Sequence, residues 1–350
     1  MPRLSIIVPI YKIPIEYLNK CLESLASIDS QDIEIILVDD GSPDSCGEVC
    51  EKYAQRDKRI ITIHTKNNGV SAARNIGIQA SSGKWVTFVD GDDWIEADYV
   101  KELLDVADET NSDIVFFSGY LNHDINQREG HFAYGNKKIF DRSNNFEQLI
   151  RRVMTIHSFT IKKFEILPID AAWGKIYRND FLRKNNIMFP VGIPVSEDGL
   201  FFLYAIKKAE RIVYYDKCVY HYRFNIESAM NQYRPHADIE QSQYLEKLHE
   251  YIDSFEDVGL EDAYYLRVLV SMRHCMAQKY FHVKNRESYL RKRREFIELI
   301  KCEPYRSALK SKSLYKSSYT LYLRTILIRL HFFELLFLMV RMKKLISKVI

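Results

Sequence analysis

Short apolar runs alternate with amphipathic stretches along the first third of the chain. The apolar runs predict β-strands at Leu4–Ile10, Ile33–Val38, Ile60–His64, Trp85–Val89 and Ile114–Phe117. The stretches between them repeat apolar residues at helical spacing and predict helices over about residues 15–28, 44–56, 70–80 and 96–109. Strands that alternate with helices predict an α/β fold with a Rossmann-like, mostly parallel central sheet. Such sheets bind ligands at the carboxyl ends of their strands.

The pattern changes after residue 117. Residues 118–142 are polar and irregular, which favours an insertion or a lid. Helices are expected near 143–154, 178–184 and 197–208, and a strand pair at Ile212–Tyr215 and Cys218–Arg223. After Pro235 the pattern is almost wholly helical. We therefore expect three parts, which are a sheet-containing domain over residues 1–230, a helical appendage over 231–312 and a basic amphipathic helix over 313–350.

Composition narrows the class of protein. The 350 residues are 47% hydrophobic and 28% charged, with 13 Gly and 9 Pro, which is typical of a globular protein. Six cysteines show neither a CxxC pair nor zinc-ligand spacing, so we expect a reducing, cytoplasmic compartment. The first apolar run is too short for a signal peptide, and no stretch of 18 uncharged apolar residues predicts a membrane-spanning helix.

Polar residues follow the second and third predicted strands. Asp39 and Asp40 precede the turn Gly41-Ser42-Pro43. A capped turn explains one acid, whereas two in a row favour a ligand site, where a carboxylate can accept the imide N–H of a uracil ring. Further along, Asn67-Asn68-Gly69 opens a helix that carries Arg74, whose guanidinium can bind phosphate or ribose oxygens. A capped helix with a solvent-exposed Arg explains that second segment equally well.

The most acidic segment follows the strand predicted at Trp85–Val89. Asp90, Asp92 and Asp93 lie within four residues, and like charges this close repel unless a cation neutralises them. Mg²⁺ and Mn²⁺ prefer carboxylate and phosphate oxygens, so a metal that bridges the acids and a diphosphate explains the segment better than an acidic helix cap.

A second acidic pair, Glu197 and Asp198, opens an apolar helix. Acids are common at helix N-termini because they interact favourably with the helix dipole. Beside an acidic metal loop, however, the pair offers the general base that a transfer reaction needs.

These segments together resemble family 2 glycosyltransferases, a group of inverting enzymes with the GT-A fold. The stretches SIIVPIYK, VDDGSPD, NNGVSAARNIG, FVDGDDW and SEDGLFF occur in the order of that family's motifs, and WGKIY and VYHYR are lesser matches. The resemblance covers roughly residues 3–230. It implies a GT-A catalytic domain over 1–230, followed by a C-terminal helical region that matches nothing in the family.

The resemblance also implies roles for single residues in nucleotide binding. Pro9, Tyr11 and Asp40 would border the uracil, with Asp40 accepting the hydrogen bond from its N3. Asn68 and Arg74 would lie near the uridine.

Further roles concern the metal and the reaction. Asp90 and Asp92 would form the family's DxD motif, with Asp92 the direct ligand of Mn²⁺ or Mg²⁺. Asp198 would be the catalytic base and Glu197 a supporting group. Residues expected near the diphosphate and the metal shell are Arg223, Ser228 and His221.

Residues and resemblance agree on one reaction, a metal-assisted single displacement with inversion. We expect a hexosyl- or N-acetylhexosaminyl-transferase that moves a sugar from a UDP-sugar to a hydroxyl of a glycan or lipid-linked glycan, as in cell-surface polysaccharide assembly. The alternative is a catalytically silent nucleotide-sugar-binding protein, against which the Glu197-Asp198 pair argues. No GxGxxG follows the first strand, which excludes a dinucleotide-binding oxidoreductase, and residues 9–16 lack the Gly-rich loop of a nucleotidyltransferase.

The C-terminal segment carries a strong positive charge. From Leu314 to Ile350 there are seven Lys or Arg and one acid, Glu334, although the whole chain has a net charge of only +3. A single helix here would place Leu323, Ile326, Leu330, Phe333, Phe337 and Val340 on an apolar face. Such a helix either packs on the protein's own appendage or lies peripherally on an anionic inner membrane face. Nucleic-acid binding is not expected, because the basic residues share one apolar helix.

Overall fold

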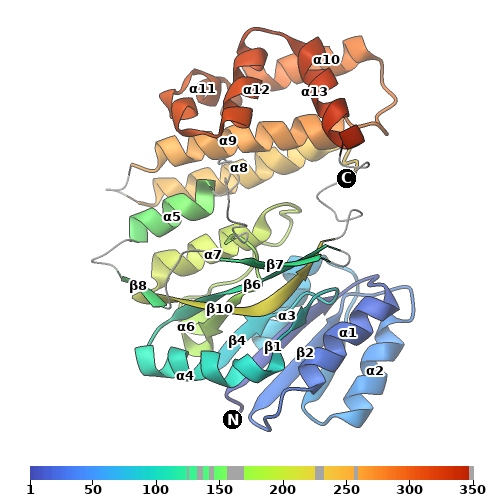
Figure 1. The fold of residues 1–350 in the computed structure, drawn as a ribbon, viewed down its shortest axis with the longest axis vertical. Helices are drawn as coiled ribbons and strands as arrows, with labels where there is room; N and C mark the ends of the chain where they lie inside the picture. The colour runs from blue at the N-terminus through green and yellow to red at the C-terminus, as the bar shows by residue number, and fades with distance from the viewer. Residues whose placement is uncertain are drawn as a thin grey trace. The chain divides into compact units, whose positions relative to one another are not determined.

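The structure is a computed structural model that describes residues 1–123, 126–131, 137–141, 146–155, 169–224, 232–255 and 259–346. Contacts divide the chain into two compact units. Residues 1–150 and 163–224 form the sheet unit, and residues 151–162 and 225–350 form the helical unit (Figure 1).

The sheet unit is built on one mixed β-sheet with the order β3-β2-β1-β4-β9-β6-β10-β5, to which β7 adds beside β6 and β8 beside β10. Neighbours from β3 to β4 are parallel, as are β6 and β10, whereas β9 runs antiparallel between β4 and β6. The strands are β1 (Leu4–Ile10), β2 (Ile33–Asp39), β3 (Ile60–His64), β4 (Trp85–Phe88), β5 (Trp94–Ile95), β6 (Ile114–His123), β7 (Asn126–Gly130), β8 (Lys137–Asp141), β9 (Lys175–Arg178) and β10 (Arg211–Arg223).

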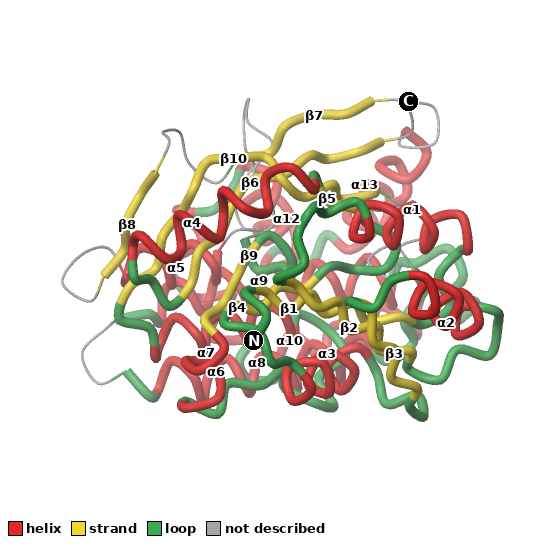
Figure 2. The backbone as a smooth tube through the Cα atoms, turned by 90° about the horizontal axis from the view of Figure 1, so that it is seen from below, coloured by secondary structure: helices red, strands yellow, loops and turns green. Residues whose placement is uncertain are grey.

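Helices cover both faces of this sheet, as parallel strands require (Figure 2). Apolar residues of α1, α2 and α4 join the main core on one face, and α3, α6 and α7 lie on the other. β1 and β2 are buried along their whole length. The helices are α1 (Ile15–Ala26), α2 (Cys46–Arg56), α3 (Val70–Ala80), α4 (Val100–Thr110), which follows a 3-10 turn at Ala97–Tyr99, α5 (Phe146–Thr155), which spans the unit boundary, α6 (Asn179–Lys184) and α7 (Glu197–Lys208).

The predicted α/β fold with a mostly parallel core sheet and a C-terminal helical region is confirmed. Two local predictions are wrong. Residues 118–142 are not irregular in the part that the structure describes, because β6 continues to His123 and β7 and β8 follow it. The strand pair predicted at 212–223 is one strand, β10, whose register against β6 shifts between Tyr215 and Cys218. A β-bulge at this shift makes the continuous strand look interrupted in sequence.

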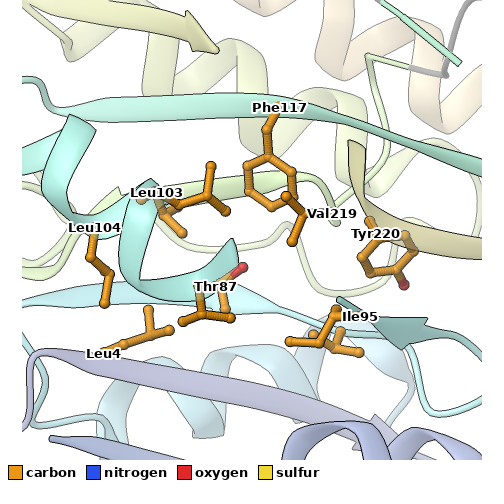
Figure 3. A pocket seen from close by; sticks show the side chains of 11 residues that line it. Leu4, Thr87, Ile95, Leu103, Leu104, Phe117, Val219 and Tyr220 are labelled. Atoms are coloured by element: carbon orange, nitrogen blue, oxygen red, sulfur yellow. The ribbon is translucent and has the colours of Figure 1, made fainter. Parts of the chain in front are cut away.

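An apolar cavity of about 20 Å³ lies between α4 and the sheet (Figure 3). Leu103 and Leu104 of α4 face Thr87, Phe117 and Val219 across it. A void this small with apolar walls stays dry, so it is a packing defect and not a ligand site.

The helical unit is centred on α9. α8 packs along one side of α9, and α11 and α12 also contact it. Its described helices are α8 (Ala237–Asp253), α9 (Glu261–Cys275), the π-helical turn Met276–Tyr280, α10 (Tyr289–Lys301), α11 (Tyr305–Lys310), the 3-10 turn Lys312–Lys316, α12 (Tyr319–Arg329) and α13 (Phe333–Ile346). In the described part of the chain, no helix combines the length and apolarity needed to cross a membrane.

The single basic helix predicted over 313–350 is wrong, because the chain breaks between α12 and α13. His331 adopts a left-handed φ of 61°. Its N–H donates to the Ile328 carbonyl (3.0 Å), and the Phe332 N–H donates to the Leu327 carbonyl (2.9 Å), which is the Schellman ending of a helix. The left-handed position of that motif is usually Gly. Because His331 occupies it here, the sequence pattern did not indicate the break.

Candidate active site

Four predicted segments meet at the carboxyl edge of the sheet. The backbone N–H of Asp40 donates to the Ile10 carbonyl (2.9 Å), and that of Thr65 donates to the Asp39 carbonyl (2.9 Å). The ends of β1, β2 and β3 therefore lie side by side, and β4 adds to them through its parallel pairing with β1. Among the residues predicted to border the uracil, Pro9 is buried in β1 beside Val38, and Tyr11 just after β1 is 42% exposed. Their roles stay predictions.

The carboxylate of Asp40 is buried among hydrogen-bond donors. It accepts bonds from the backbone N–H of Asn68 (2.9 Å), the backbone N–H of Gly69 (2.8 Å) and the hydroxyl of Thr65 (3.2 Å). A carboxylate has about four acceptor positions, so roughly one is left for a ligand. Asp40 thus fixes the segment after β3 against the end of β2, and the side chain of Asn68 is exposed there.

Asp39 has a different task from its neighbour. Its carboxylate accepts from the Ser42 N–H (3.0 Å) and the His64 ring (2.9 Å). Burial alone would raise the pKa of Asp39, but the hydrogen bonds from Ser42 and His64 hold it below its usual value. Gly41 turns the chain with a φ of 69°, and a Cβ there would lie 2.8 Å from the backbone nitrogen of Asn67. Asp39 and Gly41 therefore shape the turn that presents Asp40.

Arg74 joins the predicted metal loop to the predicted base. Its side chain is 4% exposed, and its guanidinium donates to Asp198 Oδ1 (2.5 Å) and Asp90 Oδ1 (2.9 Å). Glu197 Oε1 lies 3.5 Å from the same group. Burial would lower the pKa of Arg74, but the three carboxylates raise it above its usual value. The proximity of Arg74 to the uridine stays a prediction, because three carboxylates engage its guanidinium here.

The three carboxylates of the acidic loop after β4, those of Asp90, Asp92 and Asp93, have different surroundings. Asp93, 1% exposed, accepts from the Tyr220 hydroxyl (2.6 Å) and the Arg223 N–H (2.7 Å). Asp90 is held by Arg74, and its own N–H donates to Tyr220 (3.1 Å). The carboxylate of Asp92 has no hydrogen bond to another described residue. Burial and the charge of Asp90 raise the pKa of Asp92 to about 6.

Two cations flank this loop. The Arg223 guanidinium lies 4.0 Å from the ring centre of Tyr17 and 4.8 Å from that of Trp94, and its Nε donates to the Asp92 carbonyl (2.8 Å). Lys20 Nζ lies 3.3 Å from the centre of the Trp94 ring. Burial and the charge of Arg223 lower the pKa of Lys20. No carboxylate of the described residues lies within ion-pairing distance of Arg223 or Lys20, so both are available to an anion.

His221 is held by aromatic stacking. Its ring lies between those of Trp94 (4.7 Å) and Tyr120 (4.5 Å), and its Nε2 is 2.7 Å from Glu96 Oε1. Burial lowers the pKa of His221, with Glu96 opposing the change. Glu96 is not among the acids predicted to hold a metal, so this geometry gives no support for His221 in a metal shell.

Asp198, the candidate base, lies in the first turn of α7. The side chain of Asp198 is 23% exposed. Burial raises the pKa of Asp198 well above its usual value, Arg74 lowers it, and Glu197 and Asp90 raise it. Lys175, fully buried nearby in β9, donates to the carbonyls of Ala171 (2.7 Å) and Trp173 (3.2 Å), and burial lowers its pKa to about 7. The ionised form of Asp198 thus depends on the charge of Arg74.

Comparisons with known proteins show the family to which the chain belongs. Residues 5–170 match the family model described as glycosyl transferase family 2. Over 255 residues the chain is 35% identical to the uncharacterized glycosyltransferase EpsJ of Bacillus subtilis. This match covers 71% of this chain and 69% of EpsJ. The chain belongs to glycosyl transferase family 2.

Other known proteins are also similar to this chain. The chain is 36% identical over 227 residues to glycosyltransferase GlyA of Streptococcus pneumoniae, a match that covers 63% of this chain and 30% of GlyA. It therefore spans less than a third of that relative's length. Among solved structures, Staphylococcus aureus TarS 1–349 in complex with UDP-GlcNAc superposes with a TM-score of 0.55 at 22% identity, over 87% of this chain and 90% of TarS 1–349.

A second solved structure has a lower sequence identity to this chain. The mannosyltransferase PcManGT of Pyrobaculum calidifontis, in complex with GDP-Man and Mn²⁺, has a TM-score of 0.52 at 13% identity, over 87% of this chain and 82% of PcManGT. At these identities the two structures support the fold alone, which is the expected GT-A fold.

Away from the acidic loop, the described part of this family 2 chain contains a cluster with the spacing of metal ligands. Glu129, His131 and Cys218 place their ligand atoms within 4.8 Å of one another. His131 Nδ1 is also 2.7 Å from Asp216 and its Nε2 is 3.2 Å from Glu129. A histidine between two carboxylates needs no ion, so this cluster is explained as an ion-pair network.

The sequence patterns indicated the segments that meet at this edge of the sheet but not the contacts between them. Lys20, Tyr17 and Tyr220 were not singled out, because a lone Lys or Tyr on an amphipathic element carries no signal by itself. Asp93 was noted only as one of three acids, and its burial could not be foreseen. Ser228 lies outside the described residues, so its expected place near the diphosphate stays a prediction.

Proposed function

We propose that the chain transfers a sugar from a UDP-sugar to an acceptor hydroxyl with inversion at the anomeric carbon. The observation that carries this proposal is the Arg74 network, which joins the first acid of the DxD motif to the candidate base. A transfer enzyme needs its leaving group and its base on opposite sides of one sugar, and a shared arginine fixes Asp90 and Asp198 relative to each other.

The nucleotide subsite is proposed at the ends of β1 and β2. Asp40 has about one acceptor position left after its three internal hydrogen bonds, which suits a single imide N–H of uracil. Tyr11 is exposed beside the end of β1 and offers a ring for stacking. Arg223 and Lys20, which lack carboxylate partners among the described residues, suit the negative diphosphate.

The acidic loop fits a divalent cation. The Asp92 carboxylate has no hydrogen bond to another described residue, and Asp90 keeps one oxygen that Arg74 does not engage. Hard cations such as Mn²⁺ and Mg²⁺ take oxygen ligands. Burial and the neighbouring charge of Asp90 raise the Asp92 pKa, and a bound cation would oppose both effects by stabilising the ionised carboxylate. When bound, the ion would offset the charge that develops on the departing diphosphate.

Asp198 is the proposed base. Its carboxylate takes the proton from the acceptor hydroxyl while that oxygen forms the bond to C1 and the bond from C1 to the diphosphate breaks. Glu197 shares Arg74 with it and supports its orientation. An α-linked donor then gives a β-linked product.

The acceptor and the location complete the proposal. We propose a hexosyl or N-acetylhexosaminyl donor and a glycan or lipid-linked glycan acceptor, as in surface polysaccharide assembly. TarS, a relative at 29% identity, is named a poly(ribitol-phosphate) β-N-acetylglucosaminyltransferase, which supports a carbohydrate-polymer role. All six cysteines are free thiols, which supports a reducing, cytoplasmic compartment.

A nucleotide-sugar screen tests this function. We expect UDP-sugars to raise the melting temperature in the presence of Mn²⁺, and one of them to be slowly hydrolysed. In the Asp92→Ala variant, the Mn²⁺-dependent part of UDP binding should disappear. Asp40→Asn should weaken UDP binding with or without the metal, by about 1–3 kcal/mol. Metal-dependent binding without hydrolysis or transfer to any acceptor would instead identify the silent binding protein.

A further inference from the structure

Four large apolar side chains are exposed where α12 passes into α13. Leu330 is 58% exposed, Phe332 53%, Leu335 48% and Leu338 55%. We call this set the apolar ridge. Leu335 and Leu338 are three residues apart in α13 and share one face of the helix, and the Schellman turn sets Leu330 and Phe332 just before it.

The opposite face of α13 is fixed in the core of the helical unit. Phe333 and Leu336 are fully buried. The Phe333 ring packs edge-on to Phe296 at 5.8 Å, and Phe337 packs edge-on to Phe281 at 5.6 Å. The ridge therefore belongs to an anchored helix. The ridge shares only Leu330 with the apolar face predicted from sequence, which included Phe333 and Phe337.

Further exposed apolar residues adjoin α13. Phe337 also contacts Tyr289 at 5.8 Å, and the next residue, Leu290, is 74% exposed. Val283, two residues after Phe281, is 58% exposed. Exposed apolar side chains thus occur on α13 and directly after two residues that contact it, a concentration that favours an interaction site.

Basic residues outnumber acids in the segment that carries Val283 and Leu290, because residues 283–301 contain seven Lys or Arg and three Glu. Lys284 and Arg286 are exposed on either side of Asn285, close to Val283 in the chain. The Arg293 guanidinium lies 5.4 Å from the Phe333 ring. In the sequence from 314 to 350, the one acid among seven basic residues is Glu334, which accepts from the Tyr289 hydroxyl at 2.7 Å.

The combination of charged and apolar side chains distinguishes between two possible partners of the apolar ridge, a second copy of this chain and a lipid surface. In a symmetric dimer the same patch faces itself, so a second copy would bring together two patches that each carry a net positive charge. An anionic lipid surface offers negative headgroups to the basic residues and acyl chains to the leucines.

We propose that the apolar ridge docks the chain onto an anionic membrane surface, with Leu330, Phe332, Leu335 and Leu338 inserted at the level of the headgroups. Docking is independent of the transfer reaction, so the inference does not rest on the proposed function.

Vesicle binding by the full chain tests the proposal. We expect sedimentation with phosphatidylglycerol-containing vesicles at low salt, less at high salt, and little with pure phosphatidylcholine. Leu335→Ser with Leu338→Ser should weaken binding by at least about tenfold, because two inserted side chains lose their apolar contact. A matched control is Ile61→Ser on β3, where the side chain is 46% exposed, and it should bind like the original chain.

Three outcomes would overturn the proposal. One is no binding of the original chain to anionic vesicles at low salt, and another is undiminished binding by the double variant. The third is a concentration-dependent dimer that the double variant abolishes, which would identify a second copy as the occupant. If the double variant does not fold, Leu335→Trp supplies the readout. Its fluorescence should shift to the blue with anionic vesicles, and an unchanged spectrum would refute insertion.

Discussion

At the residue scale, buried charge organises the site more than any apolar contact. Arg74 is nearly buried, and its guanidinium forms an ion-pair network with the partly exposed acids Asp198 and Asp90. Removing one partner from such a network leaves charge uncompensated in a poor solvent, which commonly destabilises a protein by about 3–5 kcal/mol. Arg74 is separated from Asp198 by 124 residues, so no sequence pattern could pair them.

The Arg74 network makes a prediction about pH. Arg74→Gln removes the positive charge that lowers the Asp198 pKa, so that pKa should rise further. A base must be ionised to act, and therefore the acidic limb of the kcat profile should move to higher pH. The measurement is the pH dependence of UDP-sugar transfer. Arg74→Lys is the matched control, because it keeps the positive charge, and it should shift the acidic limb less than Arg74→Gln does. An unmoved limb together with lost UDP affinity would instead favour Arg74 as a uridine ligand.

At the scale of elements, strong local patterns translated directly into structure. β1 at Leu4–Ile10 and α7 at 197–208 have the predicted bounds, because a continuous apolar run and a regular helical repeat leave little ambiguity. β9 was missed, since four residues carry no periodicity and the strand forms only by insertion between β4 and β6. The break between α12 and α13 was missed because a His occupies a position that usually signals itself by Gly.

That break gives a prediction for His331. A left-handed backbone costs a residue with a side chain about 1–2 kcal/mol relative to Gly, so His331→Gly should raise the free energy of unfolding by roughly 0.5–1 kcal/mol, after loss of the edge-on contact with Phe333. His331→Ala keeps the Cβ strain and should not stabilise. Urea denaturation measures both variants. Destabilisation by Gly comparable to that by Ala would contradict the left-handed turn.

At the scale of the whole molecule, the chain contains two units with separate cores. The described residues assigned to the proposed reaction all belong to the sheet unit. In the helical unit, the basic C-terminal segment is part of the core through Leu314, Ile328, Phe333 and Leu336. The sequence offered two alternatives for this segment, self-packing and membrane contact, and the structure assigns opposite faces of α13 to burial and to exposure.

Two adjacent phenylalanines test this division. Phe333 is fully buried, so Phe333→Ala should destabilise the chain by about 3–5 kcal/mol through lost burial and a cavity. Phe332 is 53% exposed, and Phe332→Ala should change the free energy of unfolding by no more than about 0.5 kcal/mol. Chemical denaturation followed by circular dichroism measures both. Equal effects of the two substitutions would mean that α13 is not anchored as described.

Asp198 is proposed to remove the acceptor proton in a UDP-sugar transfer. Single-turnover transfer and UDP-sugar binding, measured side by side for the original chain and for Asp198→Asn, test it most directly. The substitution keeps the shape of the side chain and removes its proton affinity. We predict a fall in the transfer rate of about 10²–10⁴ with donor affinity changed less than about threefold. Near-normal transfer by Asp198→Asn would contradict the account.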